Sequence, residues 1–415
     1  MELRRLFHLL ALAAFVALPA LAAETLPSVR PEAVGMSQER LDRIHTLVQS
    51  HINAGEISGA VMLVARRGQL VYTDVQGTMD VETRQPMSRD SVFRLASMTK
   101  PVIGTAIMMM LEEGKLRLDD PVSRFIPEFG NQHTAMLLAP ATADNPISFY
   151  TVPAQRDITV KDLLTHTSGL SSGPMGQSGV REAGRRQPED TLSTYLPRVA
   201  QSALEFQPGT RWMYSASDGF DVLARVVEVA SGMPLDQFLD QRIFTPLGMT
   251  QTSHWPSDDQ MPRLVTAYGY NNGQMVKNQN SMSMSSKVYF AGGGGLVSTA
   301  DDYAKFAQML ANGGELNGKR LLSPRTVDLM SSVHIPASFP GRNPGEGFGL
   351  SMRVIEDAIA GNHRISNGSF GWSGVYGTHF WIDPKEEIVA VMMIQTPIRE
   401  MRPEFENAVM QAIIE

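Results

Sequence analysis

The clearest strand signals of this chain lie at its two ends, and they constrain the fold more than any other feature. Near the N-terminus, β-rich runs at 59–65 and 69–75 flank a short turn that contains Gly68. Near the C-terminus, runs at 378–383 and 388–394 flank a second turn. Two β-rich runs around a short turn predict a hairpin, so each end of the chain is expected to supply one hairpin.

Most of the remaining chain has helix and loop patterns. Apolar residues recur at three- and four-residue spacing in several segments, which predicts helices at 37–54, 97–113, 221–230, 300–310 and 403–414. Glycine-rich runs predict a loop at 169–179 and a flexible junction at 292–295.

Strands at both ends and helices in the middle predict an α+β fold. We expect an antiparallel sheet formed from the N- and C-terminal segments, flanked by helices, with a mostly helical inserted region. The expected boundaries are a single domain at 23–415, with an α/β part at about 30–115 and 290–415 and a helical part at about 116–289.

Residues 1–22 have the features of a signal peptide. Arg4 and Arg5 precede a mostly apolar run that is too short to span a bilayer. The triplet Ala20-Leu21-Ala22 has the small-x-small form of a cleavage site. We therefore expect an exported protein, periplasmic or secreted, with no membrane anchor.

Composition excludes several classes of site and partner. The 415 residues contain no cysteine, which excludes disulfides, thiolate metal sites, a cysteine nucleophile and a lipid-modified cysteine. The formal net charge is −7 and there is no basic block, so nucleic acid is not an expected partner. Nothing in the sequence indicates the oligomeric state.

Ser97 and Lys100 form a Ser-x-x-Lys pattern at the start of the apolar run 102–111. Residues three apart share a helix face, so the lysine can reach the serine hydroxyl. A serine hydroxyl needs such a base to act as a nucleophile, and the unpaired N–H groups of a helix start favour developing negative charge. Taken alone, the pattern is better explained by a capping serine and a solvated lysine, because a chain of this length is expected to contain about one Ser-x-x-Lys by chance.

Ser171 is a competing nucleophile, because residues 169–173 match Gly-x-Ser-x-Gly. That motif requires a strand before the serine and a helix after it. Here a helical pattern precedes the serine, and the sequence 173–176 is not expected to start a firm helix. We interpret Ser171 as a turn residue. His166 is interpreted as a helix-end histidine rather than as a catalytic partner, because Lys100 already supplies a base.

Two later stretches offer partners for Ser97. A lysine beside Tyr214 would lower the pKa of the phenol, and the pair could share the serine proton. Trp372, Ser373 and Gly374 stand in a glycine-rich stretch that allows a substrate close to the backbone. An oxyanion needs two donors aimed at one point, and we expect them to be the backbone N–H groups of Ser97 and Val375. Taken alone, Tyr214 is better explained as a packed aromatic residue beside Trp212, and the second stretch is also consistent with a glycine-rich turn that carries a core tryptophan.

Taken in order, Ser97-x-x-Lys100, Tyr214 and 372–374 resemble the serine β-lactamase/penicillin-binding superfamily, and more narrowly the class C β-lactamase-like esterases (family VIII carboxylesterases). Further matches are at 163–170, 246–250 and 292–299, and the likeness runs from about 30 to 400. The resemblance implies Ser97 as nucleophile, Lys100 as base, Tyr214 as their partner and an acyl-enzyme that water hydrolyses. It implies no metal and no cofactor.

Two departures from the class C β-lactamase pattern bear on the substrate. Ala216 stands where those enzymes have an asparagine, and Trp372 stands where they have a lysine that would pair with a substrate carboxylate. A site without both groups is expected to favour neutral acyl groups.

The leading hypothesis is a serine hydrolase that cleaves short-chain carboxylic esters. A β-lactamase or D-Ala peptidase or transpeptidase acting on cell-wall substrates is the alternative, and a non-catalytic binding protein of the same fold is a third. The acyl pocket is expected to be lined by loops at 130–150, 170–190 and 335–347, which the sequence does not place.

Overall fold

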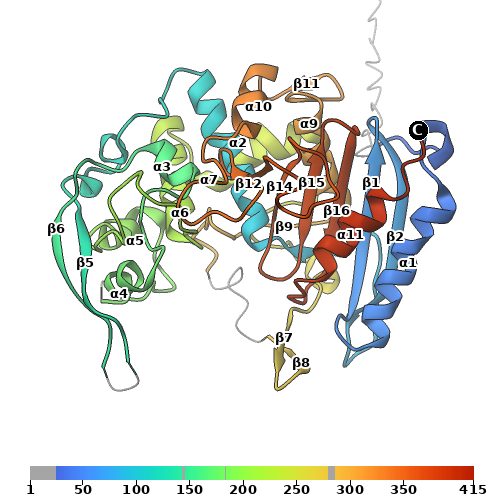
Figure 1. Ribbon diagram of the computed structural model, residues 1–415, viewed down its shortest axis with the longest axis horizontal. Coiled ribbons are helices and arrows are strands. Elements are labelled where there is room, and N and C mark those ends of the chain that lie inside the picture. Colours follow the sequence, from blue (N-terminus) through green and yellow to red (C-terminus); the bar gives the residue numbers. More distant parts are fainter. Residues whose placement is uncertain (1–24, 143–144, 183, 279–285) are drawn as a thin grey trace, which may run out of the picture.

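The computed structural model describes residues 25–142, 145–182, 184–278 and 286–415, so the predicted signal peptide lies outside the described residues. Its centre is an eight-stranded antiparallel sheet with the order β12-β13-β14-β15-β16-β1-β2-β3. Figure 1 shows this sheet on one side of the molecule and the helical region on the other.

Both predicted hairpins are present, and they lie next to each other in the sheet. β1 (Gly59–Arg66) and β2 (Gln69–Asp80) form the first, and β15 (His379–Asp383) and β16 (Ile388–Met393) form the second. β1 pairs with β16 through six residue pairs, from Val61↔Met393 to Arg66↔Ile388. The two ends of the chain thus complete one sheet, as predicted.

Four strands of the sheet were not predicted. They are β3 (Gln85–Pro86), β12 (Glu346–Phe348), β13 (Arg353–Ile355) and β14 (Phe370–Ser373). Each has at most four residues, which is too short for an alternating pattern to stand out. Pairing with neighbours, rather than local propensity, makes them strands.

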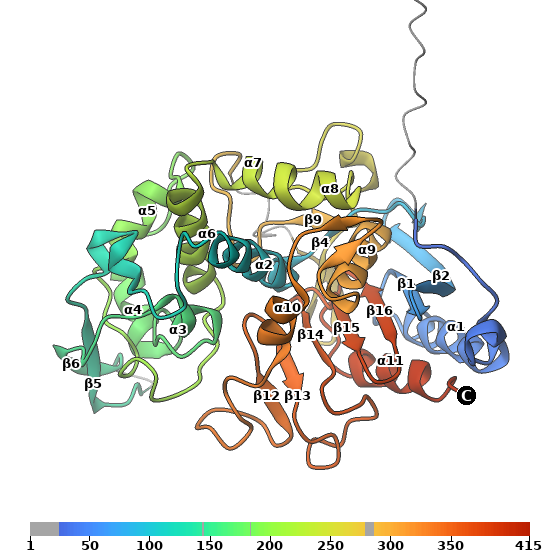
Figure 2. The ribbon, with the colours of Figure 1, turned by 90° about the horizontal axis from the view of Figure 1, so that it is seen from above.

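Helices cover both faces of the sheet (Figure 2). α1 (Gln38–Asn53) and α11 (Met401–Met410) pack on one face, and α2 (Thr99–Glu112) and α9 (Ala300–Ala311) belong to the core of the other. Accordingly all eight residues of β1 are buried. Its side chains alternate between the two cores, with Val61 in the core of α2 and Met62 in that of α1.

α2 connects the sheet to the helical region, because it also packs against α6 (Asp218–Ser231). Every residue from Thr99 to Met110 is buried, as expected for a helix that is apolar all round. Pro101 lies in its first turn, where a missing N–H leaves no bond unmade, and this confirms the predicted start of the helix close to Ser97.

The inserted region contains helices and two hairpins. Its helices are α3 (Val160–Leu164), α4 (Pro174–Glu182), α5 (Leu192–Val199), α6, α7 (Leu235–Leu239) and α8 (Thr245–Leu247). Its hairpins pair β5 (His133–Ala139) with β6 (Ser148–Pro153), and β7 (Tyr268–Asn271) with β8 (Gln274–Lys277). The expectation of a loop at 130–150 is therefore wrong for residues 133–139 and 148–150, which form strands.

The remaining short elements lie around the sheet. β4 (Phe93–Arg94) pairs with β9 (Val297–Ser298), and β10 (Glu315–Leu316) pairs with β11 (Lys319–Arg320). α10 (Pro324–Ser331) follows β11. In the part of the chain that the structure describes, no helix combines the length and apolar character needed to cross a bilayer.

α4 corrects a second expectation, since residues 174–179 were predicted to be a loop. Pro174 fits the first helical position, where its missing N–H costs no bond. The Gly176 N–H donates to Glu205 Oε2 at 2.7 Å, and a Cβ on Gly173 would lie 2.2 Å from the Glu205 carboxyl carbon. The glycines that weaken this helix locally therefore permit the close packing against Glu205 that stabilises it.

The C-terminal helix ends earlier than predicted. α11 ends at Met410, whereas the apolar pattern predicted 403–414. Beyond the helix, Ile413 bridges to Met36, and the Ile414 N–H donates to the Gly35 carbonyl at 3.0 Å. Pairing with the start of the chain replaces the last helical turn.

A histidine links the two helices of the outer face, and it predicts a pH effect on stability. His51 on α1 contacts Glu56 at 2.5 Å and Glu404 of α11 at 2.8 Å. Burial opposes protonation of His51, but the hydrogen bonds from Glu404 and Glu56 outweigh it and raise its pKa. The contribution of His51 to the free energy of unfolding is complete below its pKa in the unfolded chain, about 6.5. This contribution is lost as the pH rises through the raised pKa of His51 in the folded protein.

We therefore expect His51→Gln to be destabilising at pH 6, by about 0.5 kcal/mol as for a solvent-screened ion pair, and nearly neutral at pH 9. Urea unfolding of both proteins at the two pH values measures this difference. An equal loss of stability at pH 6 and pH 9 would contradict the assignment.

Candidate active site

Ser97 lies between β4 and α2, in a single 3₁₀ turn formed by Ala96–Met98. The preceding residue, Ala96, has a φ of +46°, a conformation that costs a non-glycine residue about 1–3 kcal/mol. The Leu95 N–H donates to the Leu296 carbonyl at 2.9 Å, which extends the β4–β9 pairing up to this turn. Ser97 is thus held in a tight turn between a strand and a buried helix.

Lys100 is fully buried and its amine reaches Ser97. Nζ lies 3.2 Å from Ser97 Oγ, 2.7 Å from the Ala216 carbonyl and 2.7 Å from the Gly293 carbonyl. Carbonyl oxygens only accept, so two hydrogens of the amine are committed to them. The remaining position on nitrogen faces Ser97, as a lone pair in the neutral amine or as an N–H in the ammonium. Lys100 can therefore take the proton of Ser97.

Tyr214 completes the trio. Its hydroxyl donates to Ser97 Oγ at 2.6 Å, and Lys100 Nζ lies 5.0 Å from the centre of its ring. The structure thus brings together the three residues that the sequence suggested for nucleophilic chemistry. With Lys100 and Tyr214 both in contact with Ser97 Oγ, a proton that leaves the serine has two neighbouring groups through which it can be passed on.

The end of β14 forms one wall of a cavity beside Ser97. The cavity has a volume of about 300 Å³ and is lined by Ser97, Tyr214, Arg353, Trp372, Ser373, Gly374, Val375 and Arg402. All the site residues suggested by the sequence line this cavity except Lys100, which is buried and contacts Ser97 Oγ without lining the cavity. The two arginines were not anticipated.

Trp372 and Ser373 lie on opposite faces of β14. The Trp372 ring packs 5.5 Å from Tyr214 and 5.3 Å from Phe348, measured between ring centres. The hydroxyl of Ser373 lies 2.8 Å from His379 Nδ1. Burial lowers the pKa of His379 to about 4, so this histidine is neutral at pH 7.

Gly374 and Val375 follow the strand as a turn. The Gly374 N–H donates to the Thr378 carbonyl at 2.7 Å, whereas the Val375 N–H donates to no described residue. A Cβ on Gly374 would lie 2.3 Å from Thr378 Oγ1 and 2.4 Å from the Leu95 carbonyl, so only glycine lets this turn approach the Ser97 segment. Val375 thus offers an unused donor at the cavity wall.

The Gly292–Gly295 run is a packed support rather than the flexible junction that we expected. A Cβ on Gly292 would lie 2.3 Å from the Phe220 carbonyl, so only glycine permits the close contact of this segment with α6. The Gly293 N–H donates to Asp221 Oδ1 at 2.8 Å, and the other Asp221 oxygen accepts from Tyr289 at 2.7 Å. Asp221 thereby holds the carbonyl that binds Lys100.

His166 supports Tyr214 and does not contact Ser97. It is buried, its Nδ1 accepts the Ser215 N–H at 3.2 Å, and its ring lies 4.6 Å from that of Tyr214. Burial and the nearby charge of Lys100 lower its pKa well below the usual value, so it is neutral. A catalytic role as a base is not indicated, in agreement with the sequence interpretation, but its support of residue 215 was not foreseen.

Ser171 lies in a turn and is buried, and it does not line the cavity. The segment before it is α3, not a strand, so the geometry of a nucleophile elbow is missing. Its interpretation as a turn residue is confirmed, although the helix after it was not expected.

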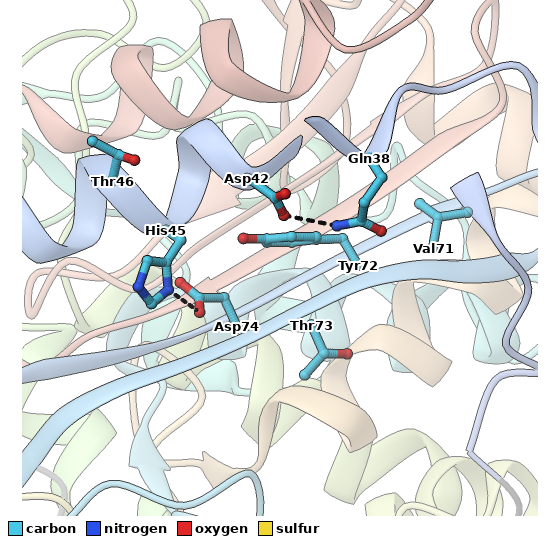
Figure 3. Close-up of a pocket in the computed structure, with 8 residues that line it drawn as sticks. All are labelled: Gln38, Asp42, His45, Thr46, Val71, Tyr72, Thr73 and Asp74. Carbon is cyan, nitrogen blue, oxygen red and sulfur yellow. Dashed lines mark hydrogen bonds and ion pairs between the residues drawn. The ribbon is translucent and has the colours of Figure 1, made fainter. Parts of the chain in front are cut away.

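A larger hollow lies on the other face of the sheet, between α1 and β2 (Figure 3). His45 Nδ1 contacts Asp74 at 3.0 Å, and Gln38 contacts Asp42 at 2.7 Å. No serine, cysteine or lysine lines it, so it lacks the nucleophile and amine present beside Ser97. Among the described residues, no group of three or more His, Asp or Glu side chains is arranged to hold a metal ion.

Comparison with known proteins agrees with this geometry. The Beta-lactamase family profile matches residues 44–413. This chain belongs to the Beta-lactamase family. Protein Rv1367c of Mycobacterium tuberculosis is 36% identical over 368 residues, which cover 86% of this chain and 90% of that protein. Esterase EstB of Burkholderia gladioli is 30% identical over 403 residues, which cover 91% of this chain and 96% of that protein.

Solved structures agree as well. The structure of EstCE1, described as a hydrolase with promiscuous acyltransferase activity, superimposes with a TM-score of 0.75 at 30% identity. The match covers 91% of this chain and 99% of EstCE1. The β-lactamase/transpeptidase fold and the relationship to the esterase branch are therefore confirmed.

Gly374 provides a test of how closely the β14 turn and the Ser97 segment must fit. We expect Gly374→Ala to displace one of them, to cost about 1–3 kcal/mol of stability as overpacking does, and to slow labelling of Ser97 by a fluorophosphonate probe at least about tenfold. Gly269→Ala is the matched control, because a Cβ there meets nothing within 4 Å. Unchanged labelling in Gly374→Ala would show that the close contact is unimportant.

Proposed function

We propose that this protein is a serine hydrolase that cleaves short-chain carboxylic esters through an acyl-Ser97 intermediate. The observation that carries the proposal is the contact of Ser97 Oγ with both Lys100 Nζ, at 3.2 Å, and the Tyr214 hydroxyl, at 2.6 Å. The similarity to Esterase EstB and to EstCE1 supports ester chemistry. The cavity of about 300 Å³ is at the small end for ligand sites, which favours short substrates.

In the proposed first half-reaction, Ser97 Oγ attacks the carbonyl carbon of the ester while its proton passes to the Lys100–Tyr214 pair. The carbonyl oxygen becomes an oxyanion that accepts hydrogen bonds from the backbone N–H groups of Ser97 and Val375. The bond to the alkoxy group then breaks, the pair returns the proton to the leaving alcohol, and the acyl group stays on Ser97.

In the second half-reaction, water replaces the alcohol. The Lys100–Tyr214 pair takes a proton from water as it attacks the acyl carbon, the second oxyanion uses the same two donors, and the Oγ–acyl bond breaks. The proton goes back to Ser97 Oγ and a carboxylic acid is released. Every proton step is assigned to groups in contact with Ser97, so the proposed cycle uses no metal or cofactor.

Esters are favoured over cell-wall substrates because of Ala216 and Trp372. Ala216 contributes its carbonyl to Lys100, but it has no side-chain amide to bind a substrate amide. Trp372 packs its ring beside Tyr214 at the position where a lysine would bind a carboxylate. A β-lactamase or D-Ala peptidase remains the alternative function. We further propose, from the sequence of residues 1–22 alone, that the protein is exported to the periplasm or secreted.

Removal of any member of the trio tests the mechanism. We expect Ser97→Ala, Lys100→Ala and Tyr214→Phe each to lower kcat/KM for 4-nitrophenyl butyrate at least about 10³-fold, as for residues that act as one unit. Ser171→Ala is the control and should retain near-normal turnover. Full activity in Ser97→Ala would overturn the proposal.

A second measurement separates the two enzyme functions. We expect 4-nitrophenyl butyrate to be turned over faster than a chromogenic cephalosporin, because the side-chain amide and lysine that would bind the lactam are missing. Faster turnover of the cephalosporin would favour the β-lactamase alternative. Intact-mass detection of the acyl-enzyme with each compound shows whether both react at Ser97.

A further inference from the structure

The segment between α10 and β12 packs against the residues that lead to Tyr214. The Trp212 N–H donates to the Pro340 carbonyl at 2.9 Å. A Cβ on Gly341 would lie 2.0 Å from the Trp212 carbonyl, and Gly341 has a φ of +93°, so only glycine permits this approach. The structure describes all of 335–347, which we expected to line the acyl pocket, and none of these residues lines the active-site cavity. The segment instead contacts the support of Tyr214.

Arg342 lies in this segment and places its cation on two aromatic rings. The guanidinium carbon lies 4.2 Å from the centre of the Trp212 ring and 5.3 Å from that of the Phe348 ring. Arg342 Nε donates to the Glu346 carbonyl at 3.2 Å and Nη2 donates to the Gly347 carbonyl at 3.0 Å, which fixes the orientation of the planar group. Burial lowers the pKa of Arg342 to about 10, so the side chain is still a cation at pH 7. A partly desolvated cation is attracted to the faces of both rings.

Trp212 and Phe348 form a closed set of four rings with Tyr214 and Trp372, which we call the aromatic cluster. The ring centres are separated by 5.7 Å from Trp212 to Phe348, 5.3 Å from Phe348 to Trp372, 5.5 Å from Trp372 to Tyr214 and 6.5 Å from Tyr214 to Trp212. The buried ring of His166 contacts three of the four. Because each ring contacts two others, the position of the Tyr214 ring depends on where Trp212 and Trp372 lie.

Hydrogen bonds do not orient the two indoles of the aromatic cluster. Nε1 of Trp212 and Nε1 of Trp372 are buried, and neither bonds to any of the described residues. Contacts between the rings and with charged groups must therefore hold the indoles in place. Among the described residues, Lys100 places a cation on the Tyr214 ring and Arg342 places one on Trp212. Lys100 is committed to the nucleophile, so Arg342 is the cation whose role the proposed mechanism leaves open.

We propose that Arg342 is a positioning residue, whose cation holds the Tyr214 hydroxyl at Ser97 Oγ through the aromatic cluster. This rests on the proposed roles of Ser97 and Tyr214. The hydroxyl lies 2.6 Å from Ser97 Oγ, and a misplacement of about 1 Å at such a contact costs about 100-fold in rate. Arg342 does not line the cavity, so it acts on the chemical step rather than on substrate binding.

Removal of the charge tests this role. We expect Arg342→Gln to lower kcat for 4-nitrophenyl butyrate about 10- to 100-fold and to change KM less than about threefold. Arg342→Lys keeps a cation without the planar group and should retain more of kcat, whereas an equal loss in both variants would contradict a role for the charge. Arg325→Gln is the matched control, because it removes the same charge from a side chain of α10 that is 91% exposed. It should change kcat less than about twofold.

A double-mutant cycle separates positioning from a general loss of structure. If Arg342 acts through Tyr214, Arg342→Gln should lower kcat of the Tyr214→Phe protein less than about twofold, because the hydroxyl that it positions is already absent. An equal loss with and without the hydroxyl, or an unchanged kcat in Arg342→Gln, would overturn the proposal. If Arg342→Gln fails to fold, Arg342→Met takes its place in the cycle, since a flexible methionine covers the rings without a charge.

Labelling of Ser97 by a fluorophosphonate probe distinguishes this proposal from the proposed esterase function. The probe reports the reactivity of the nucleophile whatever substrate the protein prefers. Unaltered protein that is labelled but hydrolyses no ester would contradict the esterase function alone, and the same cycle is then measured as labelling rates. Labelling of Arg342→Gln at the rate of the unaltered protein would instead rule out the positioning role alone.

Discussion

The site depends on how the buried amine of Lys100 is held. No described carboxylate lies within ion-pair distance of it, and its polar contacts besides Ser97 are the carbonyls of Ala216 and Gly293. A buried amine without such acceptors would be costly, so the segments that carry these carbonyls must stay in place. Asp221 secures the Gly293 segment, and His166 secures the backbone beside Tyr214. The amine of Lys100 thus connects α2 by hydrogen bonds to the segment that follows Tyr214 and to the Gly292–Gly295 run.

The fold makes that contact possible by placing α2 between the sheet and the helical region (Figures 1 and 2). The sheet itself exists only when β1 meets β16, because these strands come from opposite ends of the chain. β14 is one of the strands that the C-terminal half of the chain contributes to this sheet. Its last residues line the cavity beside Ser97, and so does Arg402 of α11. The same arrangement that joins the N- and C-terminal strands in one sheet therefore brings Arg402 to the cavity beside Ser97.

Much of this could be predicted from residues that stand close together in sequence. The Ser97–Lys100 spacing is a property of one helical turn, and the two main hairpins are marked by turns between β-rich runs. Prediction failed where distant contacts decide the local structure. Glu205 stabilises a helix at α4 in spite of its glycines, and β12 and β13 are strands only because they pair with each other and with β14. The glycine run looked flexible because its packing partner, α6, is remote in sequence.

The sequence by itself determined the residue types of the site, the α+β class and the family resemblance, because these follow from short motifs and from the order of strand and helix signals. Only the tertiary structure decided which backbone carbonyls hold Lys100 and which cation reaches the cavity. A carbonyl is present at every residue and carries no sequence signal. Arg402 is about 300 positions from Ser97, and it reaches the same cavity only because the folded chain packs its C-terminal strands and α11 next to the Ser97 segment.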